Sequence, residues 1–143
     1  MKIYISGSYS HQARLREESH KLFAMGHHIT STWLNEVVKP YYLTEEEWFH
    51  ALAVKDLAEV AAADCIICDL DGASTSGGRY VEWGFAIGKF NMLKLVVGSN
   101  RYGVFNTLAN RGFNTWVEVV DYFKTLTPVE VHKEAGNVTA IPF

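Results

Sequence analysis

Two acidic residues occupy positions where a carboxylate could do chemistry. The first, Asp56, lies in a segment in which apolar residues recur at helical spacing. These residues are Phe49, Leu52, Ala53, Val60 and Ala63. Asp56 is therefore expected to interrupt the apolar stripe that faces a sheet. Because burial is costly for a carboxylate and raises its pKa, we favour a functional role, although an aspartate bonded to buried backbone would satisfy the same pattern.

The second carboxylate, Glu82, follows a loop of small residues, 73–78, and is expected in the first turn of the next helix. Acidic residues stabilise helix N-termini, which is a sufficient structural explanation. The same position would also aim the carboxylate at a ligand held by the loop. Two carboxylates, one neutral and one ionised, can carry out displacement at the anomeric carbon of a sugar. Asp69 and Asp71, which follow a buried run, are weaker candidates for ligand contact.

The elements that must position these residues alternate between strand and helix. Strands are expected over 2–6, 27–34, 65–70 and 92–98, and helices over 11–25, 45–63, 79–89 and 115–126. Capping boxes mark two helix starts, at Thr44 with Glu47 and at Thr115 with Glu118. Continuous apolar strands separated by helices indicate an α/β fold with a doubly wound parallel sheet, which binds ligands at the carboxyl ends of its strands.

Two loops at that edge are rich in small residues. They are Ser6-Gly7-Ser8 after the first strand and residues 73–78 after the third. Such loops present backbone N–H groups and hydroxyls to phosphate or sugar oxygens, but they also serve as plain tight turns. Neither loop matches the dinucleotide fingerprint or the P-loop motif.

Length and composition narrow the function classes. The 143 residues are 48% hydrophobic, and they are expected to form one domain over 1–143, with the tail 127–143 unassigned. A net charge of −3 argues against a nucleic-acid polymer as partner. No apolar run suits a membrane span and no signal-peptide pattern occurs, so we expect a cytoplasmic protein. Cys65 and Cys68 should point to opposite faces of a strand as buried thiols, so neither a metal site nor a cofactor is expected.

Several short motifs occur in an order that resembles the nucleoside 2-deoxyribosyltransferase-like family. They are Y-I-S-G-S at 4–8, D-L at 56–57, A-D-C-I-I at 63–67, S-T-S-G-G-R-Y-V-E-W-G-F-A at 74–86, V-V-G at 96–98 and F-N-T-W at 113–116. The glycine-rich element around Glu82 is the most specific of these. The family also includes 2′-deoxynucleoside 5′-monophosphate N-hydrolases. The resemblance implies a flavodoxin-like (Rossmann-like) fold and cleavage of an N-glycosidic bond.

The resemblance also implies roles for individual residues. Glu82 matches the glutamate that attacks C1′ of the sugar, Asp56 the acid that protonates the leaving base, and Tyr4 a tyrosine beside the nucleophile. The residues expected to bind substrate are Ser6, Gly7, Ser8, Ser74, Thr75, Ser76, Gly77 and Gly78. A polar residue from a neighbouring subunit completes the site in the family, with Asn106 or Asn110 as candidates here.

The function with the best support is transfer of deoxyribose from one base to another in a nucleoside or its 5′-monophosphate. Water as acceptor would make the protein an N-hydrolase instead. A non-catalytic nucleotide-binding module would use the same loops, and a structural subunit would use the aromatic residues. Trp33, Trp48 and Trp83 could stack on a base, although core packing explains each one. The many aromatic residues also predict a homodimer or larger homo-oligomer through the helices at 45–63 and 79–89.

Overall fold

The computed structural model describes residues 1–36, 38–73, 77–99 and 102–126. Five parallel strands form one sheet in the order β2-β1-β3-β4-β5. The strands are β1 (Lys2–Ser6), β2 (His28–Ile29), β3 (Cys65–Asp69), β4 (Leu93–Val97) and β5 (Arg111–Phe113). This order is that of flavodoxin-like proteins and confirms the expected doubly wound sheet.

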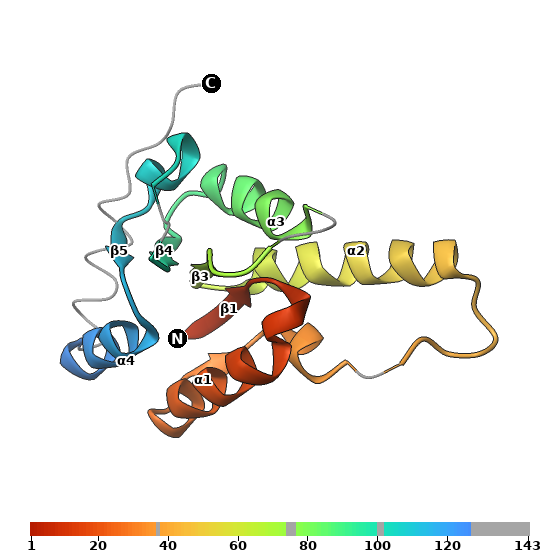
Figure 1. Ribbon diagram of the computed structural model, residues 1–143, viewed down its shortest axis with the longest axis horizontal. Coiled ribbons are helices and arrows are strands. Elements are labelled where there is room, and N and C mark those ends of the chain that lie inside the picture. Colours follow the sequence, from red (N-terminus) through yellow and green to blue (C-terminus); the bar gives the residue numbers. More distant parts are fainter. Residues whose placement is uncertain (37, 74–76, 100–101, 127–143) are drawn as a thin grey trace.

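Helices cover both faces of the sheet (Figure 1). On one face, α1 (Gln12–Ala24) packs beside α4 (Trp116–Thr125), and on the other α2 (Glu45–Ala62) packs beside α3 (Gly78–Ile87). The capping box at the start of α2 is confirmed, because the Thr44 hydroxyl and the Glu47 carboxylate each accept a backbone N–H of the other residue. The first and last helices, α1 and α4, therefore form one layer, the consecutive helices α2 and α3 form the other, and the central strands lie between them.

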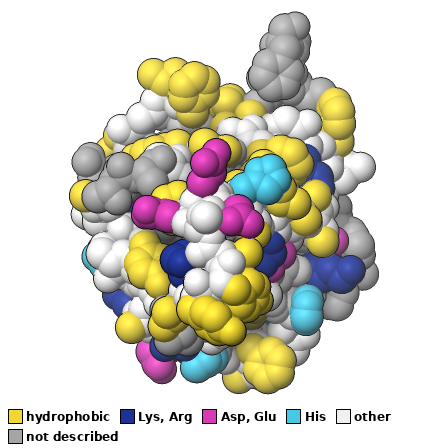
Figure 2. Space-filling view, turned by 90° about the vertical axis from the view of Figure 1, so that its right-hand side faces the viewer, with side chains coloured by type: hydrophobic (Ala, Val, Ile, Leu, Met, Phe, Trp, Pro, Cys, Tyr) yellow, Lys and Arg dark blue, Asp and Glu magenta, His cyan; other side chains and the backbone are white. Residues whose placement is uncertain are grey.

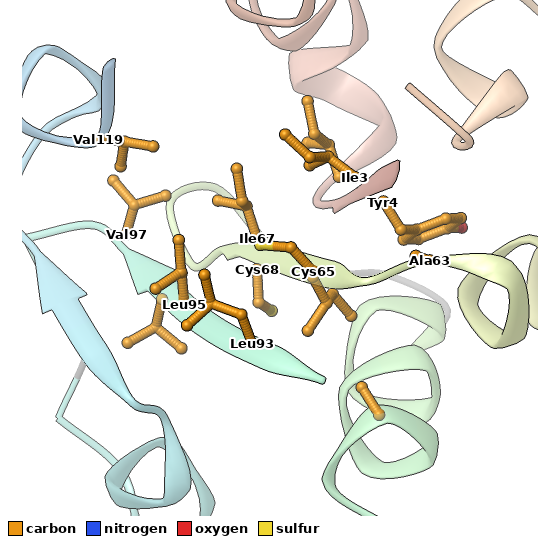
Figure 3. Close-up of a cluster of buried hydrophobic side chains, with 14 of the residues drawn as sticks. Ile3, Tyr4, Ala63, Cys65, Ile67, Cys68, Leu93, Leu95, Val97 and Val119 are labelled. Carbon is orange, nitrogen blue, oxygen red and sulfur yellow. The ribbon is translucent and has the colours of Figure 1, made fainter. Parts of the chain in front are cut away.

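Strands β3 and β4 form the centre of the core, and every residue of both is buried. Their apolar side chains serve both faces, and Figure 3 shows Val119 of α4 reaching toward Val97 of β4. Cys65 and Cys68 are free and buried, as the sequence predicts. Successive side chains of a strand point to opposite faces of the sheet, so residues three apart diverge. Cys68 lies on the face toward Glu82, and after burial itself the charge of Glu82 contributes to raising the pKa of the Cys68 thiol.

The strand expected over 27–34 is wrong in most of its length. Only His28 and Ile29 pair with β1, and residues 32–35 form a 3-10 turn, η2 (Thr32–Asn35). Side chains continue the pairing in place of the backbone. The Ile5 N–H donates to the Ser31 hydroxyl, and the Trp33 indole N–H donates to the Ile5 carbonyl. The three-residue strand β5 was not expected from the sequence.

Helix α2 packs on the sheet only near its carboxyl end. Val60 is its one buried residue, and its amino-terminal half extends past the sheet (Figure 1). Phe49 and Ala53 are exposed, so the stripe that Asp56 interrupts does not face the sheet along its whole length. Asp56 lies where the helix passes the carboxyl end of β1. No helix in the described parts of the chain is long and apolar enough to cross a membrane.

Candidate active site

Strand β1 and helix α3 bring three side chains into direct contact. The Tyr4 hydroxyl donates to Oε1 of Glu82 at 2.9 Å, and the Ser6 hydroxyl donates to Oε2. Residues 4 and 6 share one face of β1 because side chains alternate along a strand, and α3 packs against that face. Both carboxylate oxygens of Glu82 are therefore held by hydroxyl donors, and both donors come from the strand that precedes the first loop.

The environment of Glu82 raises its pKa to about 7. Burial is the main cause, and the nearby charges of Asp56 and Glu59 add to it, whereas the hydrogen bonds from Ser6 and Tyr4 oppose it. Glu82 lies in the second turn of α3, not in the first turn as expected from the sequence, because the helix begins at Gly78. The helix N-terminus therefore stabilises the ionised carboxylate less than expected, since its effect fades beyond the first turn.

Asp56 faces the same pair from α2. Its charge raises the pKa of both Glu82 and Tyr4, which places the three groups in one electrostatic cluster. The Asp56 carboxyl group is itself half-buried, and this burial raises its pKa above the ordinary value, while Lys55 opposes the shift. The Lys55 ammonium lies 3.1 Å from Oδ1 of Asp56. The fold therefore brings Asp56 within electrostatic range of Glu82, and their joint role as a catalytic pair stays a prediction.

The loop after β1 packs against α1 and bonds to the backbone that follows β3. A Cβ on Gly7 would lie 2.5 Å from Cδ1 of Leu15 and 3.4 Å from Cβ of Asp69, so glycine is needed here for close packing of α1. The Ser8 hydroxyl donates to the carbonyl of Ala73 at 2.8 Å. Ser8 therefore links the loop after β1 to Ala73, and its hydroxyl is also hydrogen-bonded to the Ser10 hydroxyl at 2.8 Å.

Arg79, the cation closest in sequence to the second loop, is buried against the backbone that follows β3. Its Nη1 donates to the carbonyls of Asp69, Asp71 and Gly72 at 3.0–3.1 Å, and its Nη2 donates to the Tyr80 hydroxyl. The guanidinium therefore fixes the backbone after β3. Ser74, Thr75 and Ser76, which were expected to bind substrate, lie outside the described residues.

The two glycines that close this loop form the start of α3. Gly77 is the N-cap and adopts a left-handed conformation, with φ of 73° and open space where a Cβ would stand. A residue with a side chain would be strained at that φ, which explains the glycine. Gly78 is the first residue of the helix.

Asp69 belongs to the opposite face of the sheet and not to this cluster. It is fully buried, and its Oδ2 accepts from Arg14 at 3.0 Å and from the Trp116 indole at 2.6 Å. Its Oδ1 accepts from the backbone N–H of Asp71 at 2.9 Å. Asp69, one of the two weaker candidates, is thus a structural carboxylate that joins β3 to α1 and α4.

The remaining candidates described here have hydrogen-bond partners other than the two carboxylates. Asn106 belongs to the 3-10 segment η3 (Val104–Leu108), and no contact described for it reaches Glu82. Asn110 is bonded to the backbone of Lys94 through both its side chain and its N–H. Trp33 and Trp83 are buried in the core, with indole N–H groups bonded to backbone carbonyls.

The sequence did not single out three charged residues around Asp56. Lys55 contacts Glu36 as well as Asp56, and Glu59 lies 3.9 Å from the Lys55 ammonium. The i,i+4 spacing of Lys55 and Glu59 was the one available signal, because residues at this spacing are neighbours on a helix. Glu36 comes from the far end of η2, and only the fold brings it to α2. No group of three or more potential metal ligands occurs among the described residues.

Fold and site together define a flavodoxin-like α/β protein with a buried, hydroxyl-bonded glutamate and an aspartate near it. No protein-family model matches the sequence, and no curated protein matches it. Solved structures do match the fold. A 2-deoxyribosyltransferase from Bacillus psychrosaccharolyticus superposes with a TM-score of 0.70 over 92% of this chain and 96% of that chain, at 16% identity.

Two further structures show the same architecture. A conserved protein from Enterococcus faecalis V583 has a TM-score of 0.63 at 17% identity, over 87% of this chain and 97% of that chain. A CMP N-glycosidase from Clostridium botulinum has a TM-score of 0.50 at 14% identity, over 88% of this chain and 100% of that chain. The fold expected from the resemblance in the motifs is therefore confirmed.

Proposed function

We propose that this protein cleaves the N-glycosidic bond of a 2′-deoxyribonucleoside or its 5′-monophosphate and transfers the deoxyribose to a second base. The observation that carries the proposal is the Glu82 carboxylate, buried, held by the hydroxyls of Tyr4 and Ser6, and faced by Asp56. The shared fold with a 2-deoxyribosyltransferase and a CMP N-glycosidase supports it.

In the first step, one oxygen of Glu82 attacks C1′ of the sugar. The C1′–N bond breaks, its electron pair stays on the base nitrogen, and Asp56 supplies the proton that this nitrogen takes up. The product on the protein is an ester between Glu82 and C1′. Tyr4 and Ser6 contribute by fixing the carboxylate before attack, which saves orientational entropy in the transition state.

In the second step, a nitrogen of an incoming base attacks C1′, the ester bond breaks and Glu82 is released as a carboxylate. The proton lost by the incoming base returns to Asp56, so the pair of carboxyl groups is restored. Water attacking in place of a base would give free deoxyribose and make the protein a hydrolase. The backbone around Gly77 and Gly78 is our candidate for contact with the 5′ end of the substrate, together with Ser74, Thr75 and Ser76.

Incubation with deoxynucleosides and their monophosphates, with and without a free acceptor base, tests the function directly. A new nucleoside formed only when the acceptor base is present is the expected result. Release of base at the same rate without an acceptor would favour the hydrolase. Binding without any bond cleavage would contradict the enzyme and leave a nucleotide-binding module.

Assembly into a homodimer is part of the same proposal. Helices α2 and α3 pack together and leave several apolar side chains exposed, among them Phe49, Val54, Val81 and Phe85. Figure 2 shows hydrophobic and acidic side chains together on the face toward which the free end of α2 points. A second copy of the same surface would bury this apolar area in a symmetric contact.

A further inference from the structure

The Lys55 ammonium is the centre of a cluster that holds one edge of the candidate site. It contacts Oδ1 of Asp56 at 3.1 Å, the Glu36 carboxylate at closer range and the Thr32 hydroxyl at 2.9 Å, and it lies 3.9 Å from Glu59. These partners come from two separate elements, α2 and the turn around η2. One cation therefore connects three carboxylates in a partly buried space.

The contact with Lys55 makes the two carboxylate oxygens of Asp56 unequal. Oδ1 is buried and has Lys55 as its ionic partner, without a further hydrogen bond. No described residue hydrogen-bonds Oδ2. A carboxyl group anchored by one oxygen has its second oxygen in a fixed direction, ready for a substrate group. Without the ammonium, Asp56 would face Glu36 and Glu59 with no compensating positive charge among its described neighbours.

We propose that Lys55 is a positioning residue of the candidate site, which fixes the orientation of the Asp56 carboxyl group by holding its Oδ1. This inference rests on the proposed function for its catalytic meaning. Lys55 touches no reacting atom in the scheme above and acts through Asp56. Its own pKa is raised, because the carboxylates around it outweigh the burial that would lower it, so it remains a cation and does not supply the proton.

The charges that act on Asp56 come from every element around it. Lys55 and Glu59 belong to α2, Glu36 follows η2, and Tyr4 and Glu82 face it from β1 and α3. Lys55 favours the ionised form of Asp56, whereas burial and the carboxylates Glu36 and Glu59 oppose it. Removing the ammonium must therefore raise the pKa of Asp56, and removing the Glu36 charge must lower it.

The test is a carboxyl ¹³C NMR titration of Asp56 in the full chain, compared among Lys55→Met, Lys55→Arg and Glu36→Gln. We expect the midpoint of Asp56 to rise by about one pH unit in Lys55→Met, as for the loss of an opposite charge at contact distance. Lys55→Arg should restore it, and Glu36→Gln should lower it. Lys21→Met is the matched control, because that lysine pairs with Glu18 on α1 and should leave Asp56 unchanged.

The pH dependence of kcat/KM should shift in the same direction as the Asp56 midpoint. The acid limb of the pH profile of kcat/KM should move to higher pH in Lys55→Met and return in Lys55→Arg. An Asp56 midpoint that stays constant in both Lys55→Met and Glu36→Gln would overturn the inference, and Glu36→Gln alone decides it if Lys55→Met does not fold. The titration needs no substrate. Absence of bond cleavage by the wild type would therefore count against the proposed function and not against the hold of Lys55 on Asp56.

Discussion

Tyr4 and Glu82 are 78 positions apart in the chain and are joined by a hydrogen bond of 2.9 Å. The phenol comes from a central strand and the carboxylate from the second turn of α3. The same carboxylate raises the pKa of the Tyr4 hydroxyl, after burial itself, so the phenol stays protonated and remains a donor. The bond therefore has a fixed direction, with the proton on Tyr4 and the lone pair on Glu82.

A first prediction concerns the pH dependence of the reaction. Glu82 has a pKa of about 7 and interacts with Asp56, so the pair of carboxyl groups loses its last proton near pH 7 as the pH rises. The scheme needs one proton on the pair, for the leaving base, and one ionised carboxylate. The profile of kcat/KM should therefore be bell-shaped, with a basic limb near pH 7.

Tyr4→Phe provides the control for this assignment. Its hydrogen bond favours the ionised form of Glu82, so its loss should raise the pKa of Glu82 and move the basic limb to higher pH. A basic limb that moves to lower pH in Tyr4→Phe, or a profile that is flat between pH 5 and 9, would contradict Glu82 as the group that titrates.

A second prediction concerns stability. The pKa of Glu82 is about 7 in the folded protein, compared with an ordinary value of 4.5 that we take for the unfolded chain. Because the folded value is raised, the stability contributed by this group is complete below pH 4.5 and is lost as the pH rises through 7. The difference corresponds to about 3 kcal/mol. Glu82→Gln should therefore be more stable than the wild type at pH 8 and equal to it at pH 4.5.

Urea unfolding at the two pH values measures this difference. Exposed Glu17 on α1 offers a matched substitution, and Glu17→Gln should give the same unfolding free energy as the wild type at both. A Glu82→Gln variant that is less stable than the wild type at pH 8 would show that the carboxylate is held by its hydroxyl donors more strongly than it is penalised by burial.

A third prediction concerns the chemistry of the two carboxylates. Glu82→Gln keeps the size of the side chain but removes the charge that attacks C1′, so turnover should fall by orders of magnitude while substrate still binds. Asp56→Asn removes the proton donor, so substrates with good leaving bases should lose least activity. Mass spectrometry of the wild type, quenched during turnover, should detect a deoxyribosyl adduct on Glu82. Near-normal activity of Glu82→Gln would contradict the assignment of Glu82 as the nucleophile.

Much of this architecture could be predicted from local sequence. The helix start at Thr44, the buried strands and the divergence of Cys65 and Cys68 follow from capping and periodicity, which are properties of neighbouring residues. The end of the strand after Ile29 could not be predicted. It depends on the side chains of Ser31 and Trp33, which bond the backbone N–H and carbonyl of Ile5 in β1 where a longer strand would have used its own backbone.

The candidate site shows the same division. Asp56 stood out because it interrupts an apolar stripe, and Glu82 because it follows a loop of small residues. The role of Ser6 as a donor to Glu82 could not be predicted, because a small residue after a strand is equally compatible with a turn or a ligand loop. The burial of Arg79 also depends on tertiary structure, since its three carbonyl partners are arranged only when the loop after β3 folds over it.

A fourth prediction concerns Arg79 and the 5′ end of the substrate. Because its Nη1 is engaged with three carbonyls, Arg79→Met should leave these acceptors unsatisfied and cost on the order of 3 kcal/mol of stability. The ratio of kcat/KM for a monophosphate to that for its nucleoside should stay unchanged. We also expect no preference of the wild type for a triphosphate in the absence of metal. A marked triphosphate preference, or a phosphate discrimination abolished by Arg79→Met, would contradict this interpretation.

The last prediction concerns assembly through α2 and α3. Val81 is 60% exposed and Phe85 41%, and the space where a Cβ would stand on Gly84 is open, so these positions form a small-residue notch flanked by apolar side chains on one side of α3. Phe49, which is 57% exposed on α2, is a further exposed apolar side chain of the two packed helices. A carboxylate buried there without a partner would be costly, so Val81→Glu should dissociate the assembly.

Sedimentation at micromolar concentration should give at least twice the 16.1 kDa of one chain for the wild type and 16.1 kDa for Val81→Glu. Val117→Glu is the matched control, because that exposed valine lies on α4, on the other face of the sheet, and should leave the mass unchanged. A 16.1 kDa wild type would contradict the dimer and, with it, completion of the site by Asn106 of a second copy. Loss of activity in Val81→Glu alone, with Glu82 and Asp56 intact, would show that the reaction depends on the assembled form.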